Sequence, residues 1–258
     1  MHDIDFDKFK NGTTNIVTMS FDDGPENDRR LAELFNRYGI KSAFHLISDR
    51  KLLPAGVYEG HEVSCHTVHH RHMDLLNFAQ NYKEWMDNRI ALEKYCGYLV
   101  RGASYPYGNC HTDVVNSAKM AGIAYSRTTK ATNGFGIPDD FMKWDPTCHF
   151  SNAENLADSF VERSKKEWTR QLFYIWGHSY ELDTEEAWKS MEKLCRKIGG
   201  IDNVWYATNI EICDYITALK QLRIYADNSA VYNPTDTDLW ITVDGKTVAV
   251  PHMTEVRL

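Results

Sequence analysis

Four histidines fall within seven positions in the segment EVSCHTVHHRHM (62–73), and their spacing suggests a metal site. His66 and His70 are four residues apart, so a helical turn would place both on one face, where they could bind the same ion. His69 and His72 would then point elsewhere. The alternative is a polar helix start whose histidines serve as caps, because histidine pairs at this spacing also occur without a metal.

Two adjacent carboxylates in FDDGP (21–25) strengthen the metal interpretation. Asp22 and Asp23 follow an apolar segment, and in a cleft of low dielectric constant their charges would repel and raise one pKa. A bound cation removes this conflict for one carboxylate and leaves the other as a base. Two histidines and a carboxylate with an open position are typical of a catalytic zinc site. A solvated turn or an aspartyl phosphoryl acceptor are the alternatives for FDDGP.

The six cysteines are scattered and include no CxxC pair, so the sequence gives no support to a zinc ribbon or a redox motif. We expect them to be reduced and mostly buried. Cys65 adjoins His66 and is a candidate fourth ligand, although a thiolate there would close the site to substrate.

The elements that must position these residues alternate between strand and helix up to about residue 222. Predicted strands cover 15–21, 41–47, 61–66, 98–108 (running into a loop), 123–127, 172–179 and 204–208; predicted helices cover 28–39, 77–97, 113–122, 155–167, 185–200 and 211–222. This alternation predicts an α/β fold with a parallel sheet, as a barrel or an open sheet.

Four segments rich in reactive side chains follow predicted strands: 21–25, 66–70, 101–108 (RGASYPYG) and 177–182 (GHSYEL). In parallel α/β folds, ligands bind at the carboxyl ends of the strands. We therefore expect these segments to meet in one site.

The last 36 residues depart from the alternation. DLWITVDGKTVAV (238–250) has two strand-like runs around Asp244-Gly245, a strong hairpin signal. We predict a catalytic domain over 1–222 and a small C-terminal β-hairpin extension over 223–258, packed on the barrel and structural in role.

In their order along the chain, FDDGP, HTVHH, RGASYPYG and FYIWGH (173–178) resemble the motifs of polysaccharide deacetylases of the NodB-homology type, carbohydrate esterase family 4. The resemblance covers about residues 15–215 and implies a deformed (β/α) barrel. It also implies a hydrolase that removes N-acetyl groups from an N-acetylated sugar, oligosaccharide or polysaccharide. The implied cofactor is a divalent metal, zinc foremost, with Co²⁺, Ni²⁺ or Mn²⁺ as alternatives.

The resemblance assigns a role to each matching residue. Asp23, His66 and His70 would be the metal ligands. Asp22 would be the general base that activates the attacking water. His178 would be the general acid that protonates the leaving amine.

Further roles follow from the same motifs. The backbone N–H of Tyr107 would stabilise the oxyanion, and Arg101 would orient Asp22 by a charge-assisted hydrogen bond. The fourth motif of the family is where this sequence departs. Its nearest candidate is Asp145 in KWDPTCHF (143–150), at an unusual spacing, and an Asp-Pro turn would explain Asp145 without a catalytic role.

Aromatic residues near these motifs suit a carbohydrate substrate. Trp176 stands where the family commonly has a smaller aliphatic residue, and it could wall the acetyl pocket or stack on a sugar ring. Tyr105, Pro106 and Trp144 are the other candidates for substrate binding, and the alternative for the aromatic ones is a place in the core.

Other functions have weaker support. A related C–N hydrolase acting on a non-sugar amide or a cyclic ureide would be expected to lose the histidine pair, and a non-catalytic carbohydrate-binding protein would be expected to lose Asp22 or His178. Phosphoryl transfer would need lysine and threonine companions. There is no G-x-G-x-x-G or Walker A motif for a nucleotide.

The formal net charge of −7 argues against a nucleic-acid partner, and no apolar window is long enough for a membrane span. The amino terminus, MHDIDFDKFKNGTTN, does not resemble a secretory signal, which predicts a cytoplasmic protein. A soluble glycan precursor, an oligosaccharide or a small N-acyl compound would then be the expected substrate.

Overall fold

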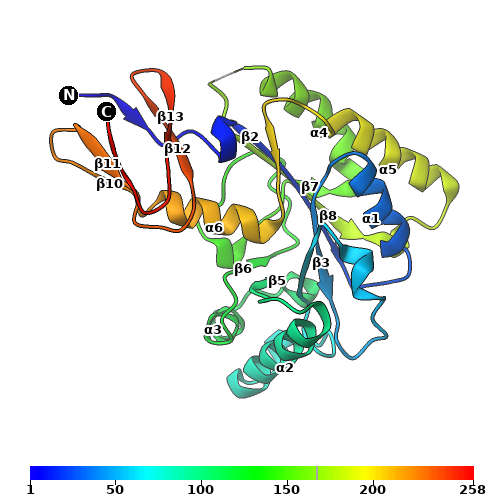
Figure 1. The fold of residues 1–258 in the computed structure, drawn as a ribbon. Coiled ribbons are helices and arrows are strands. Elements are labelled where there is room, and N and C mark those ends of the chain that lie inside the picture. Colours follow the sequence, from blue (N-terminus) through cyan, green and yellow to red (C-terminus); the bar gives the residue numbers. More distant parts are fainter. Residues whose placement is uncertain (167) are drawn as a thin grey trace.

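A curled parallel sheet forms the centre of the computed structural model, which describes residues 1–166 and 168–258 (Figure 1). The strand order is β6-β5-β4-β3-β2-β8-β7, and β9 also pairs with β2. The strands are β2 (Asn15–Asp22), β3 (Ser42–Leu46), β4 (Glu62–Cys65), β5 (Gly102–Ser104), β6 (Tyr125–Arg127), β7 (Cys148–His149), β8 (Gln171–His178) and β9 (Val204–Tyr206). The predicted deformed (β/α) barrel is confirmed.

Six α-helices among the described residues pack on the sheet, the first five against one face and the last against the opposite face (Figure 1). They are α1 (Asp28–Arg37), α2 (Phe78–Cys96), α3 (Thr112–Met120), α4 (Phe150–Ser164), α5 (Glu185–Ile198) and α6 (Asn209–Leu219). The helix predicted over 155–167 begins five residues earlier, and its last position, 167, lies outside the described residues. None of the described helices combines the length and apolar character needed to cross a membrane.

β2 is the central strand, and all eight of its residues are buried. Its apolar residues Val17, Met19 and Phe21 pack into the hydrophobic core on one face. The buried Thr18 and Ser20 on the other face form hydrogen bonds with Asn209 and Tyr174. Its last residue, Asp22, is the register partner of His178 on β8 and of His45 on β3. The sheet therefore places three polar side chains in one row at the carboxyl end of its central strands.

The carboxyl-terminal region consists of two three-stranded antiparallel sheets beside the barrel (Figure 1). One contains β10 (Arg223–Ile224), β11 (Ala230–Tyr232) and β14 (Glu255–Arg257); the other contains β1 (Ile4–Asp5), β12 (Leu239–Val243) and β13 (Lys246–Val250). The hairpin predicted around Asp244-Gly245 is confirmed, with positive φ at both residues. The amino-terminal strand β1 joins this region through β12, and a domain division at residue 222 remains a proposal.

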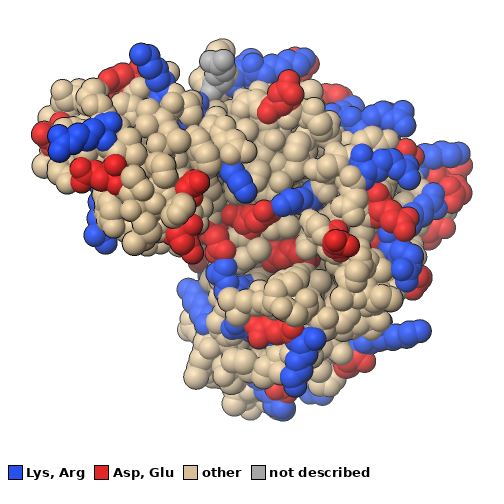
Figure 2. Space-filling view, in the orientation of Figure 1, with Lys and Arg blue, Asp and Glu red and all other residues tan. Residues whose placement is uncertain are grey.

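A groove of about 510 Å³ separates α6 from the carboxyl-terminal strands. Figure 2 shows acidic side chains gathered in the hollow of this face, and Glu211, Asp214, Asp236 and Asp238 line the groove. The two acids on α6 bind cations from the barrel: Glu211 lies 2.8 Å from Lys41, and Asp214 lies 2.5 Å from Arg101. These ion pairs attach α6 to the amino-terminal ends of β3 and β5.

Buried polar contacts connect the start of α1 to the loop that follows β8. The Asp28 carboxylate accepts hydrogen bonds from Tyr58 (3.0 Å) and Ser179 (2.5 Å), and the side-chain amide of Asn27 donates to the Ser179 and Leu182 carbonyls. Burial raises the pKa of Asp28 to about 8. The folded protein thus holds a proton on Asp28 that the unfolded chain releases near pH 4.

This proton makes stability depend on pH. A group whose folded-state pKa is raised contributes stability that is present at low pH and is lost as the pH rises through that pKa. As the pH rises from about 5 to about 7, the gradual loss of this contribution should lower the free energy of unfolding by up to about 1.4 kcal/mol per pH unit. Asp28→Asn should show a correspondingly shallower decline in denaturant titrations. Equal pH slopes for the two proteins would contradict the protonated state.

Candidate active site

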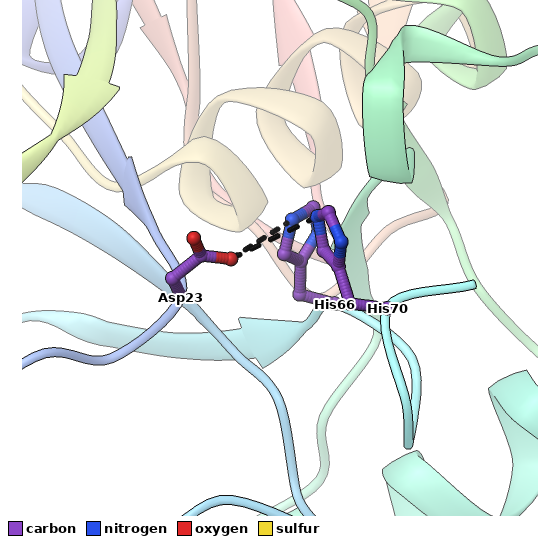
Figure 3. Close-up of side chains that lie close together, drawn as sticks. All are labelled: Asp23, His66 and His70. Carbon is purple, nitrogen blue, oxygen red and sulfur yellow. Dashed lines mark ion pairs between the residues drawn. The ribbon is translucent and has the colours of Figure 1, made fainter. Parts of the chain in front are cut away.

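Asp23, His66 and His70 converge at the carboxyl end of the sheet (Figure 3). The Asp23 Oδ1 atom lies 3.6 Å from His66 Nε2 and 3.8 Å from His70 Nε2. Ligand atoms that share a tetrahedral ion at 2.0–2.1 Å are about 3.3–3.5 Å apart. The three atoms are therefore close to the separation that one shared cation requires, and too far apart for direct hydrogen bonds.

A loop, and not a helix, brings the two histidines together. His66 directly follows β4, and both Thr67 and His70 have left-handed backbone conformations, with φ of 64° and 52°. The Thr67 hydroxyl accepts a hydrogen bond from the His70 amide at 3.0 Å. The prediction that helical spacing aligns His66 and His70 is wrong, because a tight turn closed by Thr67 does so.

The residues fit a divalent cation. Within the described residues, the buried Asp23 Oδ1 atom has no hydrogen-bond partner. His66 Nδ1 lies 2.9 Å from the Ser104 carbonyl oxygen, so a proton on Nδ1 leaves Nε2 free to bind a metal. Burial lowers the pKa of His66 to about 3 and also lowers that of His70, which keeps both imidazoles neutral, as metal ligation requires. Burial and the neighbouring Asp22 charge raise the pKa of Asp23, and a cation would relieve that conflict.

The other two histidines of the cluster point away from the three ligands. His69 Nδ1 lies 2.7 Å from Glu84, whose carboxylate also accepts from the Val68 and His69 amides and so anchors the loop. The His72 ring stacks on Tyr107 with centroids 3.9 Å apart. Both side chains therefore contact neighbouring residues of the site instead of Asp23.

Asp22 is held by three donors in the interior. Arg127 forms a buried ion pair with Oδ2, His45 Nδ1 lies 3.0 Å from Oδ1, and the Ser104 hydroxyl donates to Oδ1 at 3.2 Å. Burial alone would raise the pKa of Asp22, but the Arg127 charge, the nearby His66 and the hydrogen bond from His45 hold it well below its ordinary value. Asp22 is thus a fixed, ionised carboxylate beside Asp23.

The prediction that Arg101 orients Asp22 is wrong. Arg101 binds Asp214 on α6, at 2.5 and 3.1 Å, and it lies at the amino-terminal end of β5. Arg127, at the carboxyl end of β6, occupies the position expected of Arg101. Its guanidinium lies between Asp22 and the Trp176 ring, 4.2 Å from the ring centroid.

Asp145 does not meet the catalytic residues. Its carboxylate accepts a hydrogen bond from the Thr128 hydroxyl and lies 3.7 Å from Lys130. These contacts close a turn next to Arg127, which agrees with the alternative of an Asp-Pro turn. A catalytic role for Asp145 has no support in this geometry.

His178 ends β8 and has a carboxylate partner that the sequence did not suggest. Glu181 Oε1 lies 3.1 Å from His178 Nδ1, and Glu181 Oε2 lies 2.9 Å from His149 Nε2. These three side chains are a second group that could hold a metal. Glu181 is already at direct ion-pair distance from both rings, however, whereas Asp23 is separated from its histidines by a gap suited to an ion.

The predicted substrate-binding aromatics are mostly core residues. Tyr105 and Trp144 are each 1% exposed, and Pro106 is also buried, so the expected contact of these three with a sugar is wrong. Trp176 is half-buried against Arg127 and His149. The exposed rings belong to other residues of the segments 101–108 and 177–182.

These exposed rings are Tyr107, 53% exposed, and Tyr180, 48% exposed. Tyr107 has a left-handed backbone with φ of 59°, and its ring lies 4.7 Å from that of His70. Tyr180 stacks on His178 with centroids 4.9 Å apart. Both rings therefore border the group formed by the metal ligands and His178.

Several residues of the site were missed from the sequence. Arg127 ends the predicted strand over 123–127, and His45 lies two residues before the end of the predicted strand over 41–47, so their positions near strand ends were an available signal. Glu181 and Tyr180 stand in GHSYEL, where only the histidine had been considered. His149 ends β7, a strand of two residues that was too short to predict.

Residues 9–126, which include FDDGP, HTVHH and RGASYPYG, match the sequence model of a family described as polysaccharide deacetylase. A search of curated proteins finds no match.

Several solved structures share the fold. A putative polysaccharide deacetylase from Mycobacterium smegmatis aligns with a TM-score of 0.64 and 14% identity, over 83% of this chain and 93% of that one. A family 4 carbohydrate esterase from Streptomyces lividans, in complex with acetate, aligns with a TM-score of 0.51 and 16% identity, over 74% and 91%. A mutant of the peptidoglycan deacetylase PdaC from Bacillus subtilis gives 0.53 and 15%, over 80% and 91%.

The reassignment of the arginine can be tested by stability. Arg127→Gln leaves the buried Asp22 carboxylate without its cation and should lower the free energy of unfolding by about 3–5 kcal/mol. Arg101→Gln breaks a partly exposed pair and should cost about 1 kcal/mol or less. Denaturant titrations of both variants at neutral pH compare them directly. A larger loss for Arg101→Gln would restore the original assignment.

Proposed function

We propose that the chain is a divalent-metal-dependent hydrolase that removes N-acetyl groups from an N-acetylated sugar, and the match of residues 9–126 to the polysaccharide deacetylase family supports this proposal. One observation carries the proposal: the Asp23, His66 and His70 atoms converge beside a separately held, ionised Asp22. A cation site next to a fixed carboxylate base is what hydrolysis of a stable amide needs.

A divalent ion bound by Asp23, His66 and His70 would polarise the amide carbonyl and lower the pKa of a water molecule. Zinc suits two nitrogens and one oxygen best, and Co²⁺, Ni²⁺ or Mn²⁺ would also be accepted. Asp22 then takes the proton from the attacking water. Its contacts with Arg127 and His45 keep its carboxylate ionised and aimed before substrate arrives.

His178 supplies the proton that the leaving amine needs. His178 and Asp22 are register partners on adjacent strands, which supports a proton donor and a base acting at one site. The Glu181 carboxylate accepts the Nδ1–H of His178, so Nε2 is the atom that gains and donates the second proton when the imidazole is protonated. The backbone N–H of Tyr107 is the proposed oxyanion donor, in a turn whose left-handed conformation sets the direction of that N–H.

A sugar substrate agrees with the exposed rings of Tyr107 and Tyr180, because aromatic faces pack against the apolar faces of sugar rings. The related Streptomyces lividans esterase was solved with acetate, which favours acetyl as the acyl group here.

Because the two aspartates have different proposed roles, substitutions at the site should affect metal binding and activity differently. Asp22→Asn removes the base and leaves the buried Arg127 without its anion, so it should be less stable but retain the metal, and it should lose about 10²- to 10⁴-fold in acetate release from N-acetylglucosamine oligomers. His66→Ala should lose both metal and activity. Elemental analysis of the purified proteins and enzymatic assay of acetate provide the two readouts.

His69→Ala is the matched control, because His69 lies in the same loop and contacts Glu84 instead of the ligands. It should retain the metal. If Asp22→Asn loses the metal while Asp23→Asn retains it, the roles of the two aspartates are reversed.

Glu181→Ala tests how His178 is positioned. It removes the carboxylate that His178 Nδ1 contacts, so kcat should fall with little change in KM, because the ring is no longer held toward the leaving amine. Glu181→Gln keeps an acceptor oxygen and should retain more of the rate. A loss of stability with unchanged kcat would show that Glu181 supports only the fold of the loop.

A further inference from the structure

An arginine stands at the opening of the proposed site without a role in the reaction described above. Arg50 lies in the loop after β3, and its Nη1 atom is 3.7 Å from Asp23 Oδ2. Its side chain is 52% exposed. The loop is fixed to the ligand loop, because the Asp49 amide donates to the Val68 carbonyl at 3.2 Å.

Arg50 faces Oδ2 of the Asp23 carboxylate, whereas the proposed metal would bind Oδ1. If Asp23 binds a metal ion, much of its charge is neutralised, and the attraction that holds Arg50 beside it weakens. The guanidinium then keeps its five donors and half of its surface toward solvent. Arg50 is thus poised to bind another anion at this opening when the metal is present.

The other carboxylates around the site are already engaged. Asp22 pairs with Arg127, Glu181 lies against two histidines, and Glu84 binds His69. Asp49, adjacent to Arg50, is the exposed acid on this loop. Lys51 follows directly and is exposed as well, so the segment 49–51 carries a net positive charge.

We propose that Arg50 selects N-acetylated sugars that also carry a carboxylate or phosphate group, an inference that rests on the proposed deacetylase function. The acetamide would be held at Asp23, His66 and His70, and the sugar ring would contact Tyr107 or Tyr180. The anionic substituent would accept hydrogen bonds from the Arg50 guanidinium. Arginine suits this task, because its planar fork binds carboxylate and phosphate with two parallel hydrogen bonds.

Three sugars test whether binding depends on an anionic group, and on which one. They are the neutral N-acetylglucosamine, N-acetylmuramic acid, which adds a carboxylate, and N-acetylglucosamine 6-phosphate. Their dissociation constants are measured by calorimetry on zinc-loaded Asp22→Asn, which binds without turnover. At least one anionic sugar should bind about 10- to 100-fold more tightly than the neutral one. The preference should be smaller in the metal-free protein, where Asp23 still competes for Arg50.

Adding Arg50→Gln to that protein should reduce the preference about tenfold or more, whereas Lys51→Gln, which changes the neighbouring exposed cation, should preserve it. Asp49→Asn should strengthen it. Equal binding of all three sugars, or a preference that survives Arg50→Gln, would overturn the inference. Acetate release by the wild-type protein from neutral N-acetylglucosamine oligomers decides the proposed function separately, whichever way the binding experiment ends.

Discussion

The buried ion pair between Arg127 and Asp22 is the interaction on which the rest of the site depends. Two adjacent carboxylates at the end of one strand cannot both be ionised in a protein interior without a compensating charge. Arg127, with His45, stabilises the charge of Asp22 and lowers its pKa, whereas Asp23 remains with a raised pKa and an unpaired oxygen. The pair thereby suits Asp22 to the proposed role of base and leaves Asp23 with an oxygen that could bind a cation.

Strand register brings these side chains together from distant parts of the sequence. Asp22 on β2 is paired with His45 on β3 and with His178 on β8. Ser104 on β5 is paired with Arg127 on β6. The parallel sheet therefore holds Asp22, Arg127 and His178, the proposed base, its guanidinium partner and the proposed acid, at the carboxyl ends of its strands. Loops add the remaining residues: the turn at Thr67 places His70, and the turn after β8 places Glu181. The rigid sheet sets the reacting groups, and the loops complete the site.

Much of this could be predicted from sequence, for identifiable reasons. The alternation of strands and helices, the pair Asp22-Asp23 and the pair His66 and His70 are local patterns, and the family motifs contain all four residues. Arg101 was taken for Arg127 because sequence does not reveal which end of a strand an arginine occupies once the strand boundaries move by a few residues. β5 begins at Gly102, so Arg101 lies at the wrong end of it.

Local sequence patterns also did not reveal which aromatic side chains are buried or which residues have a left-handed backbone conformation. Tyr105 and Trp144 are aromatic and close to the motifs, yet their rings pack with Trp85 and Tyr125 in the interior. The left-handed conformations of Thr67 and His70 are uncommon for residues other than glycine, so a helical turn was the natural expectation. The link of β1 to β12 joins the two ends of the chain, and only the folded structure displays it.

The proposed function depends on a divalent cation held by Asp23, His66 and His70 beside Asp22. Anomalous diffraction from crystals grown with zinc tests this site most directly. One strong peak is expected at about 2.0–2.2 Å from Asp23 Oδ1, His66 Nε2 and His70 Nε2, with Asp22 outside the coordination sphere. A peak among His149, His178 and Glu181 instead, or none at the three ligands, would contradict it.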